Sequence, residues 1–133
     1  MRLLTHNYLT SNVKGTEKGY PLTIEPTEIE CESSPVDRDM VLNLLPKIEY
    51  GALLRAVGQI APICDPPMPA LPAEIDTTSE GWMDKLDEAT INDLHRVLFD
   101  VHLINGNLVC PDTGRKFPVK ESIPNMLLHE DEI

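Results

Sequence analysis

The residues best suited to chemistry in this chain form half of a zinc knuckle near its C-terminus. Cys110 begins the segment Cys-Pro-Asp-Thr-Gly, in which Thr113 stands where a second cysteine would complete the knuckle. Upstream, where a second pair of ligands would belong, the sequence has Ser11 and Thr16. Structural zinc is held by four Cys or His ligands, and neutral hydroxyls are poor substitutes. We therefore expect no bound zinc, and we expect Cys110 to be a small buried side chain.

The other nucleophilic and titratable residues do not suggest a catalytic site. The sequence contains neither a Gly-x-Gly-x-x-Gly loop nor a Gly-x-Ser-x-Gly elbow. His95 and His102 are seven residues apart, but no further ligand or base stands at a matching spacing. A Cys–His dyad is the remaining nucleophilic alternative, and nothing in the sequence orders one. We expect the chain to be no enzyme and to bind no cofactor of its own.

A binding function is indicated by an apolar run just before the acidic C-terminal tail. The run is Ile123-Pro124-Asn125-Met126-Leu127-Leu128. Pro124 has no backbone N–H, which favours the edge of a sheet over a central strand. An unpaired apolar edge allows strand addition by another chain. The alternative is a terminal strand packed wholly onto its own core, and the residues alone leave both interpretations open.

Composition limits the kinds of partner and compartment. The formal net charge of −11 and the absence of a basic run argue against direct nucleic-acid binding, which requires clustered Lys and Arg. The chain is 41% hydrophobic but only 5% aromatic, so its core must be aliphatic. Three cysteines without a secretory signal favour a reducing compartment. No apolar stretch approaches the ~20 residues of a membrane span, so we expect an intracellular soluble protein.

Hydrophobic periodicity predicts strands at both ends of the chain and helices between them. The expected elements, in order, are a short helix over 3–9, a strand over 21–25 that extends towards Cys31, helices over 36–48 and 53–60, an extended Pro-rich loop over 62–78, and a helix from about 79 to 98 or 101. Asp37 or Asp39 is expected to cap the second helix. Asn105-Gly106 between apolar runs predicts a type I′ hairpin turn, and residues 115–119 predict another strand.

These elements predict an α+β fold in which both termini form one small antiparallel, zinc-ribbon-like sheet that has lost its metal. The sheet domain is expected to comprise residues 1–34 and 101–128, and residues 35–100 an inserted helical domain. Residues 129–133 are expected to be a flexible tail. In place of zinc, apolar packing must hold the sheet together, and Ile24, Leu108, Val109 and Phe117 are the candidates.

Three segments in this order resemble the multifunctional methyltransferase subunit family, and the likeness covers nearly the whole chain. They are Leu3-Leu4-Thr5-His6-Asn7-Tyr8-Leu9, Cys110-Pro111-Asp112-Thr113-Gly114-Arg115 with Phe117-Pro118, and Ile123-Pro124-Asn125-Met126-Leu127-Leu128. The resemblance implies a zinc-ribbon-like domain made from both termini with a helical insertion. Zinc-binding members of the family carry four cysteines, three of which align with Ser11, Thr16 and Thr113. The resemblance is therefore to members without metal.

The resemblance also implies a function. Such subunits activate and stabilise S-adenosylmethionine-dependent methyltransferases that act on tRNA, rRNA and translation release factor. The catalytic partner, a Rossmann-like subunit, binds S-adenosylmethionine and any RNA, and the heterodimer is expected in cytoplasm and nucleus. The implied partner-binding residues are Thr5, His6, Asn7, Ile123, Pro124, Asn125, Met126, Leu127 and Leu128. Two alternatives remain, a protein-binding adaptor unrelated to methylation and a small independent enzyme.

Overall fold

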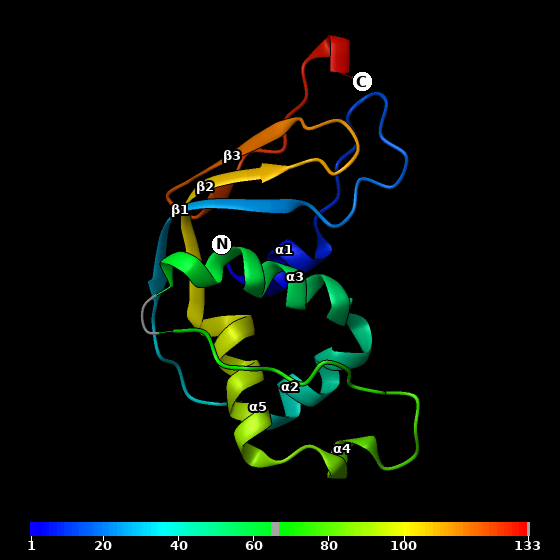
Figure 1. Cartoon of the computed structure of the whole chain (residues 1–133), viewed down its shortest axis with the longest axis vertical. Coiled ribbons are helices and arrows are strands. Elements are labelled where there is room, and N and C mark those ends of the chain that lie inside the picture. Colours follow the sequence, from blue (N-terminus) through cyan, green and yellow to red (C-terminus); the bar gives the residue numbers. More distant parts are fainter. Residues whose placement is uncertain (65–66, 133) are drawn as a thin grey trace.

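The computed structural model describes residues 1–64 and 67–132, which form a sheet lobe and a helical lobe (Figure 1). Both ends of the chain build the sheet lobe, and the segment between them builds the helical lobe, as predicted. The four strands are antiparallel in the order β1-β2-β3-β4. The strands are β1 (Thr23–Cys31), β2 (Val101–Val109), β3 (Lys116–Lys120) and β4 (Ile123–Pro124), and the helices are α1 (Leu3–Tyr8), α2 (Arg38–Leu44), α3 (Tyr50–Ile60), α4 (Trp82–Lys85) and α5 (Glu88–His95).

The longest pairing of the sheet joins two strands that are distant in sequence. β1 and β2 pair from Thr23 opposite Val109 to Cys31 opposite Val101, although the whole helical lobe lies between them in the chain. The register shifts on either side of Glu28, so β1 carries an irregularity there. The predicted extension of β1 beyond its proline to Cys31 is confirmed.

The predicted hairpin turn at Asn105-Gly106 is wrong, because both residues lie inside the continuous strand β2. A Cβ on Gly106 would come within 2.4 Å of the Glu25 carbonyl oxygen, so glycine is needed here for close approach to β1. The Asn105 side chain bridges its neighbours, donating to Glu28 Oε1 at 3.2 Å and accepting from the Glu121 backbone N–H at 3.3 Å. The Asn-Gly pair therefore serves cross-strand packing.

Side-chain caps set the beginnings of two helices. Asp37 accepts a hydrogen bond from the Met40 N–H and begins α2, which confirms the predicted cap. Asp87 does the same for the Thr90 N–H and begins α5. The single helix expected from residue 79 onward is therefore split, because Leu86 is extended and Asp87 starts a new helix. A π-helical turn over Arg96–Asp100 ends α5, and Val101 already belongs to β2.

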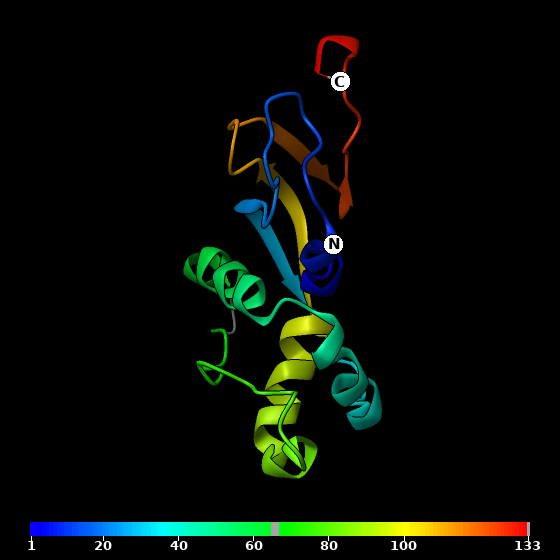
Figure 2. The ribbon, with the colours of Figure 1, turned by 90° about the vertical axis from the view of Figure 1, so that its right-hand side faces the viewer.

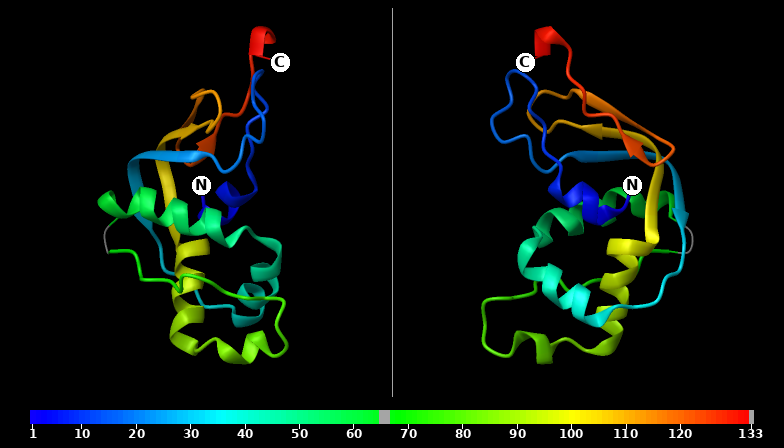
Figure 3. Two further views of the ribbon diagram at one scale, coloured as in Figure 1. Left: turned by 45° about the vertical axis from the view of Figure 1, so that its right-hand side comes forward. Right: turned by 180° about the vertical axis from the view of Figure 1, so that it is seen from behind.

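A continuous aliphatic core joins the two lobes. α1 and α3 lie between the sheet and the remaining helices (Figures 2 and 3). Phe117, Leu108 and Ile24 of the expected replacement core are buried, and Val109 is half-buried. In residues 1–64 and 67–132 no helix is long and apolar enough to cross a membrane.

Candidate partner-binding surface

The C-terminal apolar run forms the outer edge of the sheet next to β3. Val119 pairs with Pro124 and Lys120 with Ile123, and the Asn125 N–H donates to the Pro118 carbonyl at 2.9 Å. Among the described residues, β4 pairs with β3 alone and has no strand on its other side. The backbone of this edge is therefore open to a strand from another chain.

Exposure alternates along the run with the two-residue period of an extended chain. Ile123 is 69% exposed and Leu127 is 79% exposed, and Asn125 between them is exposed as well. Met126 and Leu128 are half-buried against the core of the chain. Ile123, Asn125 and Leu127 thus fit the interpretation of an open edge, whereas Met126 and Leu128 fit that of a strand packed on its own core. The two sets alternate because successive residues of an extended segment face opposite sides.

Two shallow hollows flank this run. One has a volume of about 730 Å³ and a largely apolar lining made by Pro118, Lys120, Ile123, Pro124, Asn125, Met126 and Leu127. The other, of about 530 Å³, is lined by Arg115, Pro118, Asn125, Leu127, Leu128 and His129. Leu127 lines both hollows. A partner seated on this edge would meet an exposed leucine beside one largely apolar hollow and one hollow of mixed polar and apolar lining, which suits a protein-binding site.

The N-terminal residues of the predicted site divide into one exposed and two buried side chains. Thr5 is exposed, but His6 and Asn7 are 1% and 3% exposed. His6 Nε2 lies 2.7 Å from the Leu22 carbonyl, and Asn7 exchanges two hydrogen bonds of 2.9 Å with the backbone of Glu49. Both side chains are therefore buried in the isolated chain, and the contact of His6 and Asn7 with a partner stays a prediction. The amphipathic turn of α1 directs them inward, where they join α1 to neighbouring segments.

Burial lowers the pKa of His6 below its ordinary value, and the hydrogen bond to the Leu22 carbonyl offsets part of that effect. Because the carbonyl can only accept, Nε2 carries the proton of a neutral ring. His6 is therefore a neutral, buried linking residue in the folded chain.

The four positions of the half zinc knuckle come together although they are up to about a hundred residues apart in sequence. Thr16 Oγ1 lies 3.5 Å from Cys110 Sγ. Cys110 is buried, which by itself would raise the pKa of its thiol, but hydrogen bonds from Ser11, Thr113 and Thr16 outweigh this and lower it to about 6. One sulfur and three hydroxyls do not fit a zinc ion, which requires Cys or His ligands. Over the described ranges, no group of three or more His, Cys, Asp or Glu residues is placed to hold a metal.

The Asp112 carboxylate accepts hydrogen bonds from three backbone N–H groups and so joins the C-terminal half of the knuckle to the N-terminal half that contains Ser11 and Thr16. Asp112 Oδ2 accepts hydrogen bonds from the N–H groups of Glu17, Lys18 and Gly19 at 3.2, 3.1 and 2.8 Å. The bond from Gly19 is the main reason why the pKa of Asp112 is lowered. Gly19 has φ +64° and a Cβ there would meet the Ser11 carbonyl oxygen at 2.2 Å, so this turn requires glycine. The sequence alone gave no signal for this contact.

The described part of the C-terminal tail contacts the knuckle. Arg115 pairs with the Glu132 carboxylate, and the Lys14 N–H donates to the Glu132 carbonyl at 2.7 Å. The hydrogen bond to Arg115 is the main reason why the pKa of Glu132 is lowered to about 2. The tail forms a 3₁₀ turn, Glu130–Glu132, beside the knuckle, and the flexibility expected of residues 129–133 stays a prediction.

A cluster of Ser34, His95 and Asp100 has the residue types of a hydrolase triad but a different arrangement. The Ser34 hydroxyl donates to Asp100 Oδ1, and its oxygen lies 2.9 Å from His95 Nε2. Since the single hydroxyl proton is directed to Asp100, His95 donates to the serine and cannot act as its base. The Glu32 N–H also donates to the Asp100 carbonyl at 2.8 Å. The cluster joins the segment after β1 to the end of α5.

Known proteins similar to this chain cover almost its whole length. A family model described as Trm112p-like protein matches residues 2–122. The multifunctional methyltransferase subunit TRM112 homolog A of Arabidopsis thaliana is 41% identical over 133 residues, with both chains fully covered. The TRM112-like subunit of Bos taurus is 36% identical and covers 99% of this chain and 98% of its own length.

A solved structure has the same fold. It is a chain of the E. cuniculi Mtq2-Trm112 complex, which is described as responsible for methylation of the eRF1 translation termination factor. It aligns with a TM-score of 0.60 and 17% identity over 96% of this chain and 95% of its own. The fold, the knuckle joined from both termini and the full-length relatives lead to one conclusion: the chain belongs to the Trm112p-like family.

Proposed function

We propose that this chain is a non-catalytic subunit that activates and stabilises S-adenosylmethionine-dependent methyltransferases. The observation that carries the proposal is the open sheet edge at β4, where Ile123 and Leu127 are exposed beside a largely apolar hollow. A strand of the catalytic subunit pairs with this edge, and its apolar side chains enter the hollows. Full-length relatives named as methyltransferase subunits support the choice of partner.

The catalytic subunit, with a Rossmann-like sheet, binds S-adenosylmethionine and holds the substrate, which is tRNA, rRNA or a translation release factor. The small subunit covers an apolar patch that otherwise promotes aggregation of the enzyme. With its net charge of −11, this chain contacts RNA only through the partner. The complex works in cytoplasm and nucleus. The knuckle holds no zinc, since its donors are one sulfur and three hydroxyls.

Co-expression with candidate catalytic subunits tests the proposal. Each enzyme is produced alone, with the native chain, and with a Leu127→Lys variant, and soluble yield and methyl transfer are measured. We expect soluble, active enzyme only with the native chain. An enzyme that is equally soluble and active alone contradicts the proposal.

The second candidate function is an adaptor unrelated to methylation, which the same open edge also fits. Affinity purification of the native chain and of the Leu127→Lys variant, followed by mass spectrometry, separates the two. Methyltransferases lost from the variant sample support the subunit function. Partners without methyltransferase domains that depend on Leu127 support the adaptor.

A further inference from the structure

Two cysteines that are far apart in sequence meet where the sheet joins the helical lobe. Cys31 is the last residue of β1, and Cys64 follows the 3₁₀ turn Ala61–Ile63 at the end of α3. Their sulfur atoms are 3.8 Å apart. A disulfide bond is about 2.05 Å long, so the sulfurs need to approach by less than about 2 Å. We propose that Cys31 and Cys64 form a reversible redox pair that closes to a disulfide on reaction with a hydroperoxide.

The surroundings of the two sulfurs give them different roles. Cys31 is partly exposed at the end of an edge strand, and Cys64 is buried at 8% exposure. An oxidant from solution therefore reaches Cys31 first, and Cys64 acts as the resolving thiol. Cys64 is held in place by a hydrogen bond from its N–H to the Ala61 carbonyl at 3.3 Å. Both sulfurs are thus carried by hydrogen-bonded backbone, which fixes their encounter.

The reaction balances with hydrogen peroxide as the oxidant. The Cys31 thiolate attacks one peroxide oxygen, the O–O bond breaks, and the leaving hydroxide takes up the thiol proton to give water and a sulfenic acid. The Cys64 sulfur then attacks the sulfenic sulfur, the S–O bond breaks, and the hydroxyl leaves as a second water with the Cys64 proton. The two thiols lose two protons and two electrons, and the peroxide accepts both to form two molecules of water. A dithiol reductant reverses the step by exchange.

Closure has a defined mechanical consequence. The two residues are 33 positions apart, and α2 and α3 lie in the loop between them. The disulfide ties the end of β1 to the end of α3 and so fastens the sheet to the helical lobe. Closing a loop of this length restricts the unfolded chain, and we expect the midpoint temperature of unfolding, Tm, to rise by about 10 °C. β1 is the edge of the sheet opposite β4, so this inference does not depend on the proposed partner surface.

Peptide mapping identifies the bond directly, because each cysteine lies in a different tryptic peptide. Cleavage after Lys and Arg places Cys31 in residues 19–38, Cys64 in 56–85 and Cys110 in 97–115. The full chain is reduced, freed of reductant, treated with hydrogen peroxide at low protein concentration, and alkylated before digestion. We expect peptides 19–38 and 56–85 to be joined with loss of two hydrogen atoms, and a dithiol reductant to separate them.

Two variants complete the experiment. Cys31→Ser is expected to fold, since Cys31 is partly exposed, and to lose both the joined peptides and the rise in Tm. Cys110→Ser is expected to keep both. Joining of residues 97–115 to either peptide, disulfide-linked dimers, or cysteines that carry only added oxygen atoms would overturn the proposal. If Cys31→Ser fails to fold, the tryptic peptide map of the oxidised native chain decides by itself whether the Cys31–Cys64 bond forms.

Discussion

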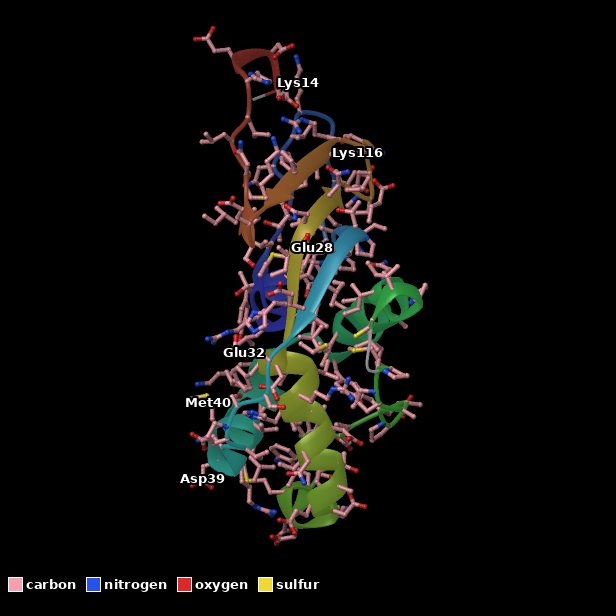
Figure 4. The ribbon with its side chains drawn as sticks, turned by 90° about the vertical axis from the view of Figure 1, so that its left-hand side faces the viewer. Lys14, Glu28, Glu32, Asp39, Met40 and Lys116 are labelled. Atoms are coloured by element: carbon pink, nitrogen blue, oxygen red, sulfur yellow. The ribbon has the colours of Figure 1, made fainter. Side chains whose placement is uncertain are left out.

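The two edges of the sheet differ in charge, in exposed apolar surface and in regularity of register, although each contains a proline. β1 carries exposed Glu25, Glu28 and Glu30, has a proline within it, and shifts register near its middle. Figure 4 shows Glu28 on β1 and Glu32 just beyond it, with Asp39 further down on the helical lobe. β4 instead continues into a run with exposed Ile123 and Leu127. The same sheet therefore has one edge protected from pairing and one edge suited to it.

The chemistry of each edge explains this difference. Carboxylates along β1 repel a second acidic chain, and the register shift around Glu28 interrupts the ladder that an added strand would need. The Ile24 N–H of β1 also donates to Gln59 Oε1 of α3, so part of this edge is already occupied. At β4, apolar side chains lose contact with water when a partner binds, which favours association. In the proposed complex, specificity for the β4 edge follows from protection of the β1 edge.

The largest expected effect comes from a charge on the open edge. Leu127→Lys places an ammonium group beside the largely apolar hollow, and we expect it to weaken binding of the catalytic subunit about 100-fold, or about 3 kcal/mol. Thr27→Lys adds the same charge on the protected edge and is expected to leave affinity unchanged. Titration calorimetry of both variants measures the difference. Equal losses from the two variants would show that net charge governs binding, whatever the edge.

The next effect separates the two faces of the C-terminal run. Leu128 packs against the core, so Leu128→Ala is expected to lower the free energy of unfolding by about 1–2 kcal/mol. Leu127→Ala removes an exposed side chain and is expected to change it by less than about 0.5 kcal/mol. Denaturant unfolding of the isolated chain compares them. The reverse ranking would contradict the alternation of exposure.

A smaller effect is expected when the protection of β1 is removed. The double variant Glu28→Val with Glu30→Val takes two carboxylates from that edge, and we expect concentration-dependent self-association. Glu80→Gln with Asp131→Asn removes the same charge elsewhere and is expected to stay monomeric. Light scattering over a range of concentrations detects the difference. A monomeric valine variant would show that the proline and register shift suffice.

Lowering the pH is expected to decrease the free energy of unfolding through His6, whose ring bonds to the Leu22 carbonyl just before β1. Its pKa is lower in the folded chain than in the unfolded chain, so the unfolded state takes up the proton first. Stability is therefore complete above about pH 6.5 and decreases as the pH falls below it. We expect Tm to fall between about pH 7 and 5, and His6→Gln to flatten that slope. The exposed His129→Gln is the control and is expected to keep it.

The smallest effect is expected from metal removal. The knuckle offers one sulfur and three hydroxyls, so we expect a strong chelator to leave Tm and partner affinity unchanged. Calorimetry before and after dialysis against the chelator tests this. A clear decrease in Tm would show that a metal does contribute to folding.

Local patterns predicted the elements that depend on near neighbours in the chain. The helix capped by Asp37, the strand that continues to Cys31 and the apolar edge from Ile123 follow from capping and periodicity. The prediction of a turn at Asn105-Gly106 was wrong because an Asn-Gly pair suits two different backbone settings. A tight turn and a close cross-strand approach both favour glycine, and β1, which decides between them, is about eighty residues earlier in the chain.

By itself, the sequence limited the apolar run around Pro124 to two interpretations, an open sheet edge or a terminal strand packed on its own core, and it showed that a single thiol with three hydroxyls is a poor zinc site. Tertiary structure decided which of these side chains are exposed to a partner and which distant residues come into contact. It buried His6 and Asn7, divided the run into inward and outward residues, and brought Cys31 to 3.8 Å from Cys64. The physical reason is that burial and proximity depend on contacts between distant segments, whereas residue type and spacing are properties of the chain alone.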